Sequence, residues 1–200
     1  MASAEARREY WRQKAEAHRE FAAAEPNAGH RVIAEWQRAG RIAGVITQNI
    51  DGLHQLAGCE KVLELHGTAR QIACQDCGAR YEASPLVDEF LQTKVVPSCG
   101  ECANGRLKHA TVSFGQSLSQ SVLQQAVQWS EQADLMFAIG SSLVVSPAAD
   151  LPRIAKQSGC RLVIINRDQT PLDSLADEVL NEPIGAALTA IKQALVDCSG

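Results

Sequence analysis

Four cysteines in two Cys-x-x-Cys pairs constrain the fold of this chain more than any other feature. The pairs are Cys74 with Cys77 and Cys99 with Cys102, and residues 78–98 separate them. A two-residue gap lets both thiolates of a pair reach one tetrahedral ion, and two such pairs complete its coordination. Because four thiolates leave no open position on the ion, we expect a structural zinc site. Redox cysteines or disulfides are the alternative that the spacing leaves open.

The rest of the chain favours a reducing compartment for these cysteines. Its start has no apolar segment of the secretory type, and no stretch reaches the roughly 18 apolar residues of a membrane helix. We therefore expect a cytoplasmic protein with no membrane partner. The remaining cysteines are isolated, and we interpret them as small buried residues or as part of a frayed terminus: Cys59, Cys160 and Cys198.

Charge and composition argue against a nucleic-acid-binding protein. The net charge is −4 and the sequence pI is about 5.7, so the chain has no basic excess to neutralise phosphates. Aromatic residues make up only 4%, too few for a stacking platform for single strands. A local site for a small anionic ligand remains compatible with both observations.

Apolar runs alternate with amphipathic segments along most of the chain. This alternation predicts an α/β fold, a Rossmann-like parallel sheet with helices on both faces. The segment 71–108 lacks the rhythm, so we interpret it as a zinc-binding insert between 1–70 and 109–200, which together form the Rossmann-like domain. The predicted helices cover about 4–24 (at the surface), 28–39, 119–131, 146–158 (with Ser146 as N-cap) and the chain from 183 onward; the predicted strands cover 42–47, 62–65, 135–139 and 162–165.

Polar clusters follow three of the predicted strands, at 48–51, 140–142 and 166–168. In parallel sheets, ligands bind at the carboxyl ends of the strands. The amide and carboxylate groups at 48–51 could fix an amide-bearing ligand, or Asp51 could simply cap a strand-to-helix turn. The turn at 140–142 could offer N–H groups and hydroxyls to a ribose or phosphate, although it is no Gly-x-Gly-x-x-Gly motif.

His66 is the one histidine with a suggestive context, because it follows a strand and precedes Gly67. Histidine titrates near pH 6.5 and can act as a general base at neutral pH. A hydrogen-bonded structural histidine is the alternative reading of this residue taken alone.

Taken in order, the motifs closely resemble those of the sirtuins, which are NAD-dependent protein lysine deacylases. From about Pro26 to near the C-terminus, the matching motifs are Thr47–His54, Ala57-Gly58, Glu64–Gly67, the two cysteine pairs, Phe114-Gly115, Gly140–Ala149 and Ile165-Asn166. The resemblance implies NAD and zinc as cofactors and an acylated-lysine protein or peptide as substrate. It also implies attack of the acyl oxygen on the ribose C1′ as nicotinamide leaves, giving free lysine and O-acyl-ADP-ribose.

The resemblance also assigns residue roles. His66 is implied as the general base on a ribose hydroxyl, with Asn49 and Asp51 as further catalytic residues in the nicotinamide–ribose pocket. The implied NAD-binding residues are Gln48, Asn49, Asp51, Gly140, Ser141, Ser142, Asn166 and Arg167. The peptide would add as a β-strand between two segments whose residues are Val112, Phe114, Gly115, Leu143, Val144 and Val145.

Two departures from the family pattern are visible. Complete sirtuins begin with a strand, a Gly-Ala-Gly phosphate loop and a Pro-Asp-Phe-Arg motif, none of which is present here. We therefore expect a sheet that lacks its first strand. Gln116 stands where the family usually has glutamate after Phe-Gly.

Three hypotheses remain from the sequence. The first is an NAD-dependent deacylase, most simply a deacetylase, and the retained His66, Asn49 and Asp51 favour it. The second is a catalytically silent, N-terminally truncated zinc protein that binds a peptide or a partner. The third is an enzyme that transfers ADP-ribose to protein.

Overall fold

The computed structural model describes residues 3–102, 105–113 and 115–197, apart from the side chains of residues 19 and 20. The chain divides into two compact units, each built from three segments. Unit 1 comprises Met1–Glu25, Asn49–Leu53 and His66–Gln116, and unit 2 comprises Pro26–Gln48, His54–Leu65 and Ser117–Gly200.

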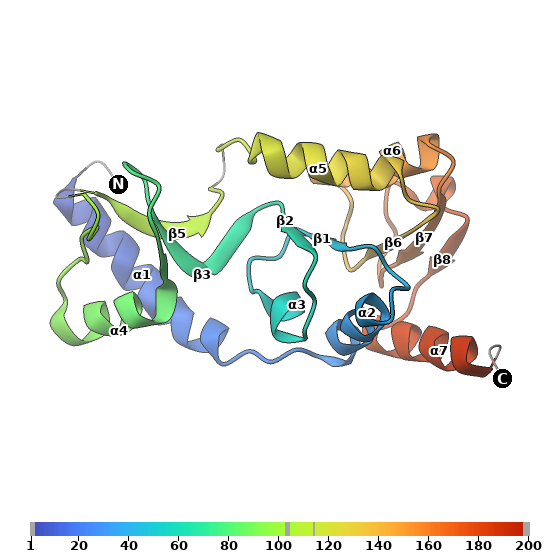
Figure 1. Ribbon diagram of the computed structural model, residues 1–200, viewed down its shortest axis with the longest axis horizontal. Helices are drawn as coiled ribbons and strands as arrows, with labels where there is room; N and C mark the ends of the chain where they lie inside the picture. Colours follow the sequence, from blue (N-terminus) through green and yellow to red (C-terminus); the bar gives the residue numbers. More distant parts are fainter. Residues whose placement is uncertain (1–2, 103–104, 114, 198–200) are drawn as a thin grey trace. The chain divides into compact units, whose positions relative to one another are not determined.

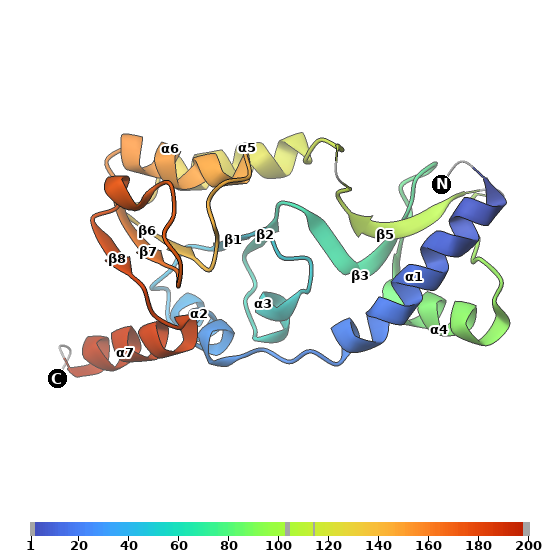
Figure 2. The same cartoon turned by 180° about the vertical axis from the view of Figure 1, so that it is seen from behind.

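Unit 1 is a small antiparallel sheet with two helices. The strand order is β4-β3-β5, with β3 at Gly67–Cys74, β4 at Arg80–Glu82 and β5 at Leu107–Thr111. Helix α4 (Ala83–Thr93) lies beside helix α1 (Ala4–Ala22), as both views in Figure 1 and Figure 2 show. The sequence predicted none of these strands, nor α4, because this region shows little periodicity.

Helix α1 is more than the predicted surface helix, because one face of it is buried in unit 1. Trp11 has no exposed surface, and its indole Nε1–H donates to the Leu107 carbonyl at 3.3 Å. Trp11 shares a core with Ile72, Val87 and Phe90. Burial of a whole tryptophan side chain contributes several kcal/mol to stability. This burial holds the helix against unit 1, although many of its other residues are charged.

Unit 2 contains two parallel ladders. Strand β1 (Val45–Thr47) pairs with β2 (Val62–Glu64), and α3 (Leu53–Leu56) lies between them in sequence. Strand β7 (Arg161–Ile165) is the middle of a second ladder, with β6 (Leu135–Ile139) on one side and β8 (Glu178–Leu180) on the other. β6 and β7 run in register, so that Ile139 lies opposite Ile165 and their carboxyl ends meet at one edge.

Helices cover both faces of the second ladder (Figure 2). Side chains of β6 and β7 alternate, as the pleat of a strand requires. Phe137 and Ile165 pack with α2 (Ala28–Arg38) and α7 (Ile184–Asp197), whereas Ala138 and Ile164 belong to a core on the opposite side. Helices α5 (Gln120–Glu131) and α6 (Leu151–Gln157) pack against each other, and α6 contacts β6 and β7. This burial explains why β6 and β7 appear in the sequence as unbroken apolar runs.

Some predicted elements need correction. The single predicted sheet is two separate ladders in the described residues, since no described strand pairs with both. The strand expected at 42–47 is shortened to Val45–Thr47, while Ile42 packs with the core beside α2. Ser146 is not a helix N-cap: a 3₁₀ turn, Ala148–Asp150, precedes α6, and its tighter hydrogen bond joins the Asp150 N–H to the Pro147 carbonyl. A second 3₁₀ turn, Asp173–Leu175, precedes β8.

The two compact units divide the chain differently from the predicted domains. Contacts place α1 with the cysteine-containing segment, whereas the sequence assigned it to the Rossmann-like domain. The predicted domain limits 1–70, 71–108 and 109–200 stay a prediction, because the two compact units are defined by packing and not as domains.

Candidate active site and metal centre

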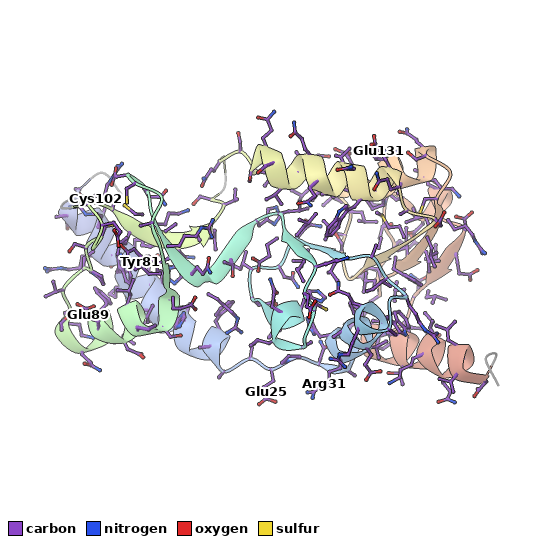
Figure 3. The ribbon with its side chains drawn as sticks, in the orientation of Figure 1. Glu25, Arg31, Tyr81, Glu89, Cys102 and Glu131 are labelled. Carbon is purple, nitrogen blue, oxygen red and sulfur yellow. The ribbon has the colours of Figure 1, made fainter. Side chains whose placement is uncertain are left out.

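The four predicted zinc ligands lie together at one end of unit 1, where Figure 3 labels Cys102. Their Sγ atoms all lie within 4.8 Å of one another, with 3.7 Å between Cys74 and Cys102 and 3.6 Å between Cys77 and Cys99. Thiolates about 2.3 Å from a tetrahedral zinc ion are about 3.8 Å apart, so these separations fit the ion. They are far too long for disulfides, which need about 2.05 Å between sulfurs.

The electrostatics of the four thiols also fit a bound cation. The Tyr81 hydroxyl, 3.1 Å from the sulfur, lowers the pKa of Cys99 to about 6. The neighbouring thiol of Cys77 raises the pKa of Cys102 to about 12. Four sulfurs this close cannot all ionise by themselves, and a divalent cation removes that conflict.

Two residues around the cluster shape it. Gly105 is required, because a Cβ there would lie 2.5 Å from the Cys74 sulfur and 2.6 Å from the Cys102 sulfur. Asp76 joins the first pair to the strand that follows the second: its Oδ2 accepts the Arg106 backbone N–H at 2.7 Å, and its Oδ1 accepts from Arg106 Nη2 at 2.6 Å. This pairing lowers the pKa of Asp76 to about 2.

The loop that follows β1 carries Asn49 and Asp51 and belongs, from Asn49 to Leu53, to unit 1. Asn49 is exposed, whereas Asp51 is half-buried and its Oδ1 accepts the Leu53 N–H at 3.0 Å. The backbone of the loop is tied to β3, because the Ala69 N–H donates to the Ile50 carbonyl at 2.9 Å. This hydrogen bond links the loop to the segment that begins at His66.

His66 lies half-buried in the turn between β2 and β3. Its carbonyl accepts the Val112 N–H at 2.9 Å, which joins the turn to the chain after β5. The following Gly67 has a φ of +70°, and a Cβ there would lie 2.0 Å from the Ala110 carbonyl oxygen. Only glycine fits this position, so the Leu-His-Gly motif has a structural reason for its last residue.

Six of the eight predicted NAD-binding residues lie in unit 2, just after the carboxyl ends of three parallel strands, whereas Asn49 and Asp51 belong to unit 1. The Gly140 N–H donates to the Ile165 carbonyl at 2.9 Å, so the turns after β6 and β7 lie side by side. Gln48, just after β1, donates from Nε2 to the Ser141 hydroxyl at 3.2 Å. Ser142 is exposed beside them. The Asn166 side chain is oriented by its Nδ2 donating to the Asp168 carbonyl at 2.8 Å, and Arg167 is exposed. Polar groups at such an edge can hold a nucleotide.

A family model described as Sir2 family matches residues 1–147 of this chain. The chain belongs to the Sir2 family. Two curated relatives agree with this assignment. NAD-dependent protein deacetylase 2 of Streptomyces coelicolor is 46% identical over 200 residues, which cover 98% of this chain and 80% of the relative. NAD-dependent protein deacetylase 1 of Bradyrhizobium diazoefficiens is 46% identical over 190 residues, which cover 94% and 74%.

Solved structures of Sir2 proteins have the same fold. A structure of Sir2Tm bound to a propionylated peptide superposes with a TM-score of 0.86 at 37% identity, covering 94% of this chain and 78% of the other. A Sir2 complex with a p53 peptide and NAD+ gives 0.81 at 39% identity, covering 88% and 72%. The sirtuin resemblance and the Rossmann-like α/β fold that the sequence predicted are thereby confirmed.

The peptide-binding residues predicted from the Sir2 resemblance have varied surroundings. Val144 and Val145 are 63% and 57% exposed, unusually high for large apolar side chains. Leu143, by contrast, is buried with a φ of +53°, so its side chain serves the core of unit 2. Val112 is half-buried in unit 1 and Gly115 is exposed. Phe114 lies outside the described residues. Their role as a peptide site stays a prediction.

Beside the candidate catalytic loop of this Sir2 chain, sequence reasoning missed Arg70. Its Nε donates to the Asp51 carbonyl at 2.6 Å, and its guanidinium carbon lies 5.3 Å from the centre of the Phe21 ring. A single arginine three residues after a glycine carries no recognisable motif, so no signal in the sequence could have found it.

Among the described residues, no helix is long and apolar enough to cross a membrane.

Proposed function

We propose that this Sir2-family chain is an NAD-dependent protein lysine deacetylase that yields nicotinamide, free lysine and O-acetyl-ADP-ribose. The observation that carries the proposal is the hydrogen bond from the Ala69 N–H to the Ile50 carbonyl. It ties the loop of Asn49 and Asp51 to the strand that begins after His66. The family's three candidate catalytic residues therefore belong to one packed unit.

His66 is the general base in this proposal. An imidazole can accept a proton at neutral pH, and the half-buried position of His66 leaves part of the ring accessible to a substrate hydroxyl. The Asn49 amide and the Asp51 carboxylate orient the nicotinamide and its ribose by hydrogen bonds. The Leu53 N–H on Asp51 Oδ1 fixes the direction of that carboxylate.

NAD is bound in this proposal at the carboxyl ends of β1, β6 and β7, and it supplies the nicotinamide–ribosyl bond that breaks. The hydrogen bond from Gln48 to Ser141 supports this assignment, because it joins the polar turns that follow β1 and β6. The remaining NAD contacts proposed here come from Gly140, Ser142, Asn166 and Arg167.

The acylated peptide adds as a strand along Leu143, Val144 and Val145 in this proposal. The exposure of Val144 and Val145 supports it, since an extended peptide would cover both side chains. Zinc is structural, because all four ligands are cysteine sulfurs. We also propose a cytoplasmic location, where thiolates for zinc stay reduced.

The test is nicotinamide release from NAD with an acetyl-lysine peptide. We expect the wild-type chain to release nicotinamide in a peptide-dependent reaction and His66→Ala to lose at least about 10²-fold in rate, the usual contribution of a general base. His30→Ala is the matched control, since His30 lies on α2 and serves its N-terminal cap. Equal release by His66→Ala and the wild type would refute the role of His66.

Product analysis separates the remaining hypotheses. Mass spectrometry should find deacetylated peptide and O-acetyl-ADP-ribose in equal amounts. A protein carrying ADP-ribose, with the acetyl group retained, would instead identify an ADP-ribosyltransferase. Absence of NAD binding in a calorimetric titration of the wild-type chain would favour the silent peptide-binding protein.

A further inference from the structure

Arg70 contacts the candidate catalytic loop, Asn49–Leu53, in two ways. Its Nε–H donates to the Asp51 carbonyl at 2.6 Å, a short bond in which the donor is charged. Its aliphatic carbons lie over Gly52, where a Cβ would be 2.6 Å from Arg70 Cδ. Gly52 also has a φ of +66°. The loop and the arginine are therefore fitted to each other within unit 1.

The surroundings of Arg70 are costly for a cation. Its Nη2 is buried and has no hydrogen-bond partner among the described residues, and no carboxylate in that part of the chain forms an ion pair with it. The Phe21 ring, 5.3 Å from the guanidinium carbon, offers only a cation–π contact. Nearby His18 is also a poor partner, since Arg70 contributes to lowering the pKa of that histidine.

Arg70 is half-buried, and its buried Nη2 gains no hydrogen bond to offset the loss of water. Such a group adds little to stability, because an apolar side chain of similar size often stabilises a protein as well or better. The role of Arg70 must then lie in the loop that it contacts. Two hydrogen bonds that tie the backbone of the loop to β3 are the Ala69 N–H to the Ile50 carbonyl and Arg70 Nε–H to the Asp51 carbonyl. The hydrogen bond from Arg70 acts directly at Asp51, the residue whose carboxylate is a candidate catalytic group.

We propose that Arg70 is a positioning residue that fixes the Asn49–Leu53 loop for binding of the nicotinamide and its ribose. The inference rests on the function proposed above. Arg70 does not touch the reacting atoms; it acts through the Asp51 backbone. Loss of the side chain should therefore weaken the use of NAD more than it weakens the fold.

The experiment compares Arg70→Met, Arg70→Lys and the control Arg80→Met. Arg80→Met also removes a side-chain hydrogen bond, from Arg80 Nη1 to Gln71 Oε1 at 2.8 Å, but Arg80 is exposed on β4. We expect Arg70→Met to raise the KM for NAD and the inhibition constant of nicotinamide about tenfold, the effect of losing one charged hydrogen bond. The KM for the acetyl peptide and the unfolding temperature should change little. Arg70→Lys, which keeps a cation near Phe21, should recover part of the loss.

Hydrogen exchange gives a readout that does not depend on activity. The Leu53 N–H donates to Asp51 Oδ1, and the Ala69 N–H donates to the Ile50 carbonyl. Both amides should exchange faster in Arg70→Met than in the wild type, and their exchange rates should not change in Arg80→Met. If the wild type releases no nicotinamide, the proposed function fails, and exchange alone decides the inference. Equal exchange in both methionine variants, or a lower unfolding temperature with an unchanged ratio of the two KM values, overturns it.

Discussion

At the scale of single residues, His109 is the clearest case of a side chain whose charge the fold suppresses. It is 3% exposed on β5, and the Tyr10 hydroxyl lies 3.3 Å from its Nδ1. Burial lowers the pKa of His109 to about 4, with smaller contributions from His18, Lys14 and Lys108. The neutral imidazole is thus part of the core of unit 1.

This suppressed charge predicts acid sensitivity. Because the pKa is lower in the folded state than the ordinary value of 6.5, the unfolded chain binds the proton more readily. The contribution of His109 is fully present above pH 6.5 and is lost as the pH falls toward 4, by up to about 3 kcal/mol. Urea unfolding at several pH values should show a shallower loss over this range in His109→Gln. An identical pH dependence in the variant and the wild type would contradict the prediction.

At the scale of secondary-structure elements, the cysteine pairs join strands that have little apolar surface of their own. Cys74 ends β3, and Cys99 lies just after Ser98, which forms an isolated bridge with Arg106. Cys74 and Cys99 are also members of the core that contains Trp11 and Phe90. The ion and the apolar core therefore support the same strands.

Cys74→Ala should accordingly lose zinc and stability together, since structural zinc contributes directly to folding. We expect less than one equivalent of zinc by atomic absorption and a lower unfolding temperature, with activity falling in parallel. Cys59→Ala is the matched control, because Cys59 is equally buried but far from the metal ligands in sequence. A Cys74→Ala protein as thermostable as the wild type would rule out a structural role for the metal.

At the scale of the whole molecule, the sequence predicted unit 2 better than unit 1. Strands β6 and β7 are buried on both faces, so their apolar runs identify them directly. Strands β3 and β5 contain polar residues such as Gln71 and Lys108, and they pack with Trp11 in a core that also contains Cys74 and Cys99. Periodicity contains no such information. Among the site residues, motifs identified His66 and the cysteines, whereas Arg70 acts through a backbone contact that no motif encodes.

Removal of zinc should be visible in the core of unit 1. The chain has three tryptophans, and only Trp11 belongs to the core shared with Cys74 and Cys99. In a variant with Trp36→Phe and Trp129→Phe, a chelator should shift the emission of Trp11 to longer wavelength as the core loosens. The complementary Trp11→Phe variant should shift less. Equal shifts in the two variants would contradict the prediction.

The interleaving of the two units also has a consequence for synthesis on the ribosome. The chain passes between them at 25/26, 48/49, 53/54, 65/66 and 116/117, so no single cut yields either one. All of unit 1 has been translated by Gln116, before the ribosome reaches the strands at 135–180. Unit 1 can therefore bind its metal before the residues of unit 2 that follow Gln116 have been translated and can cover β1 and β2.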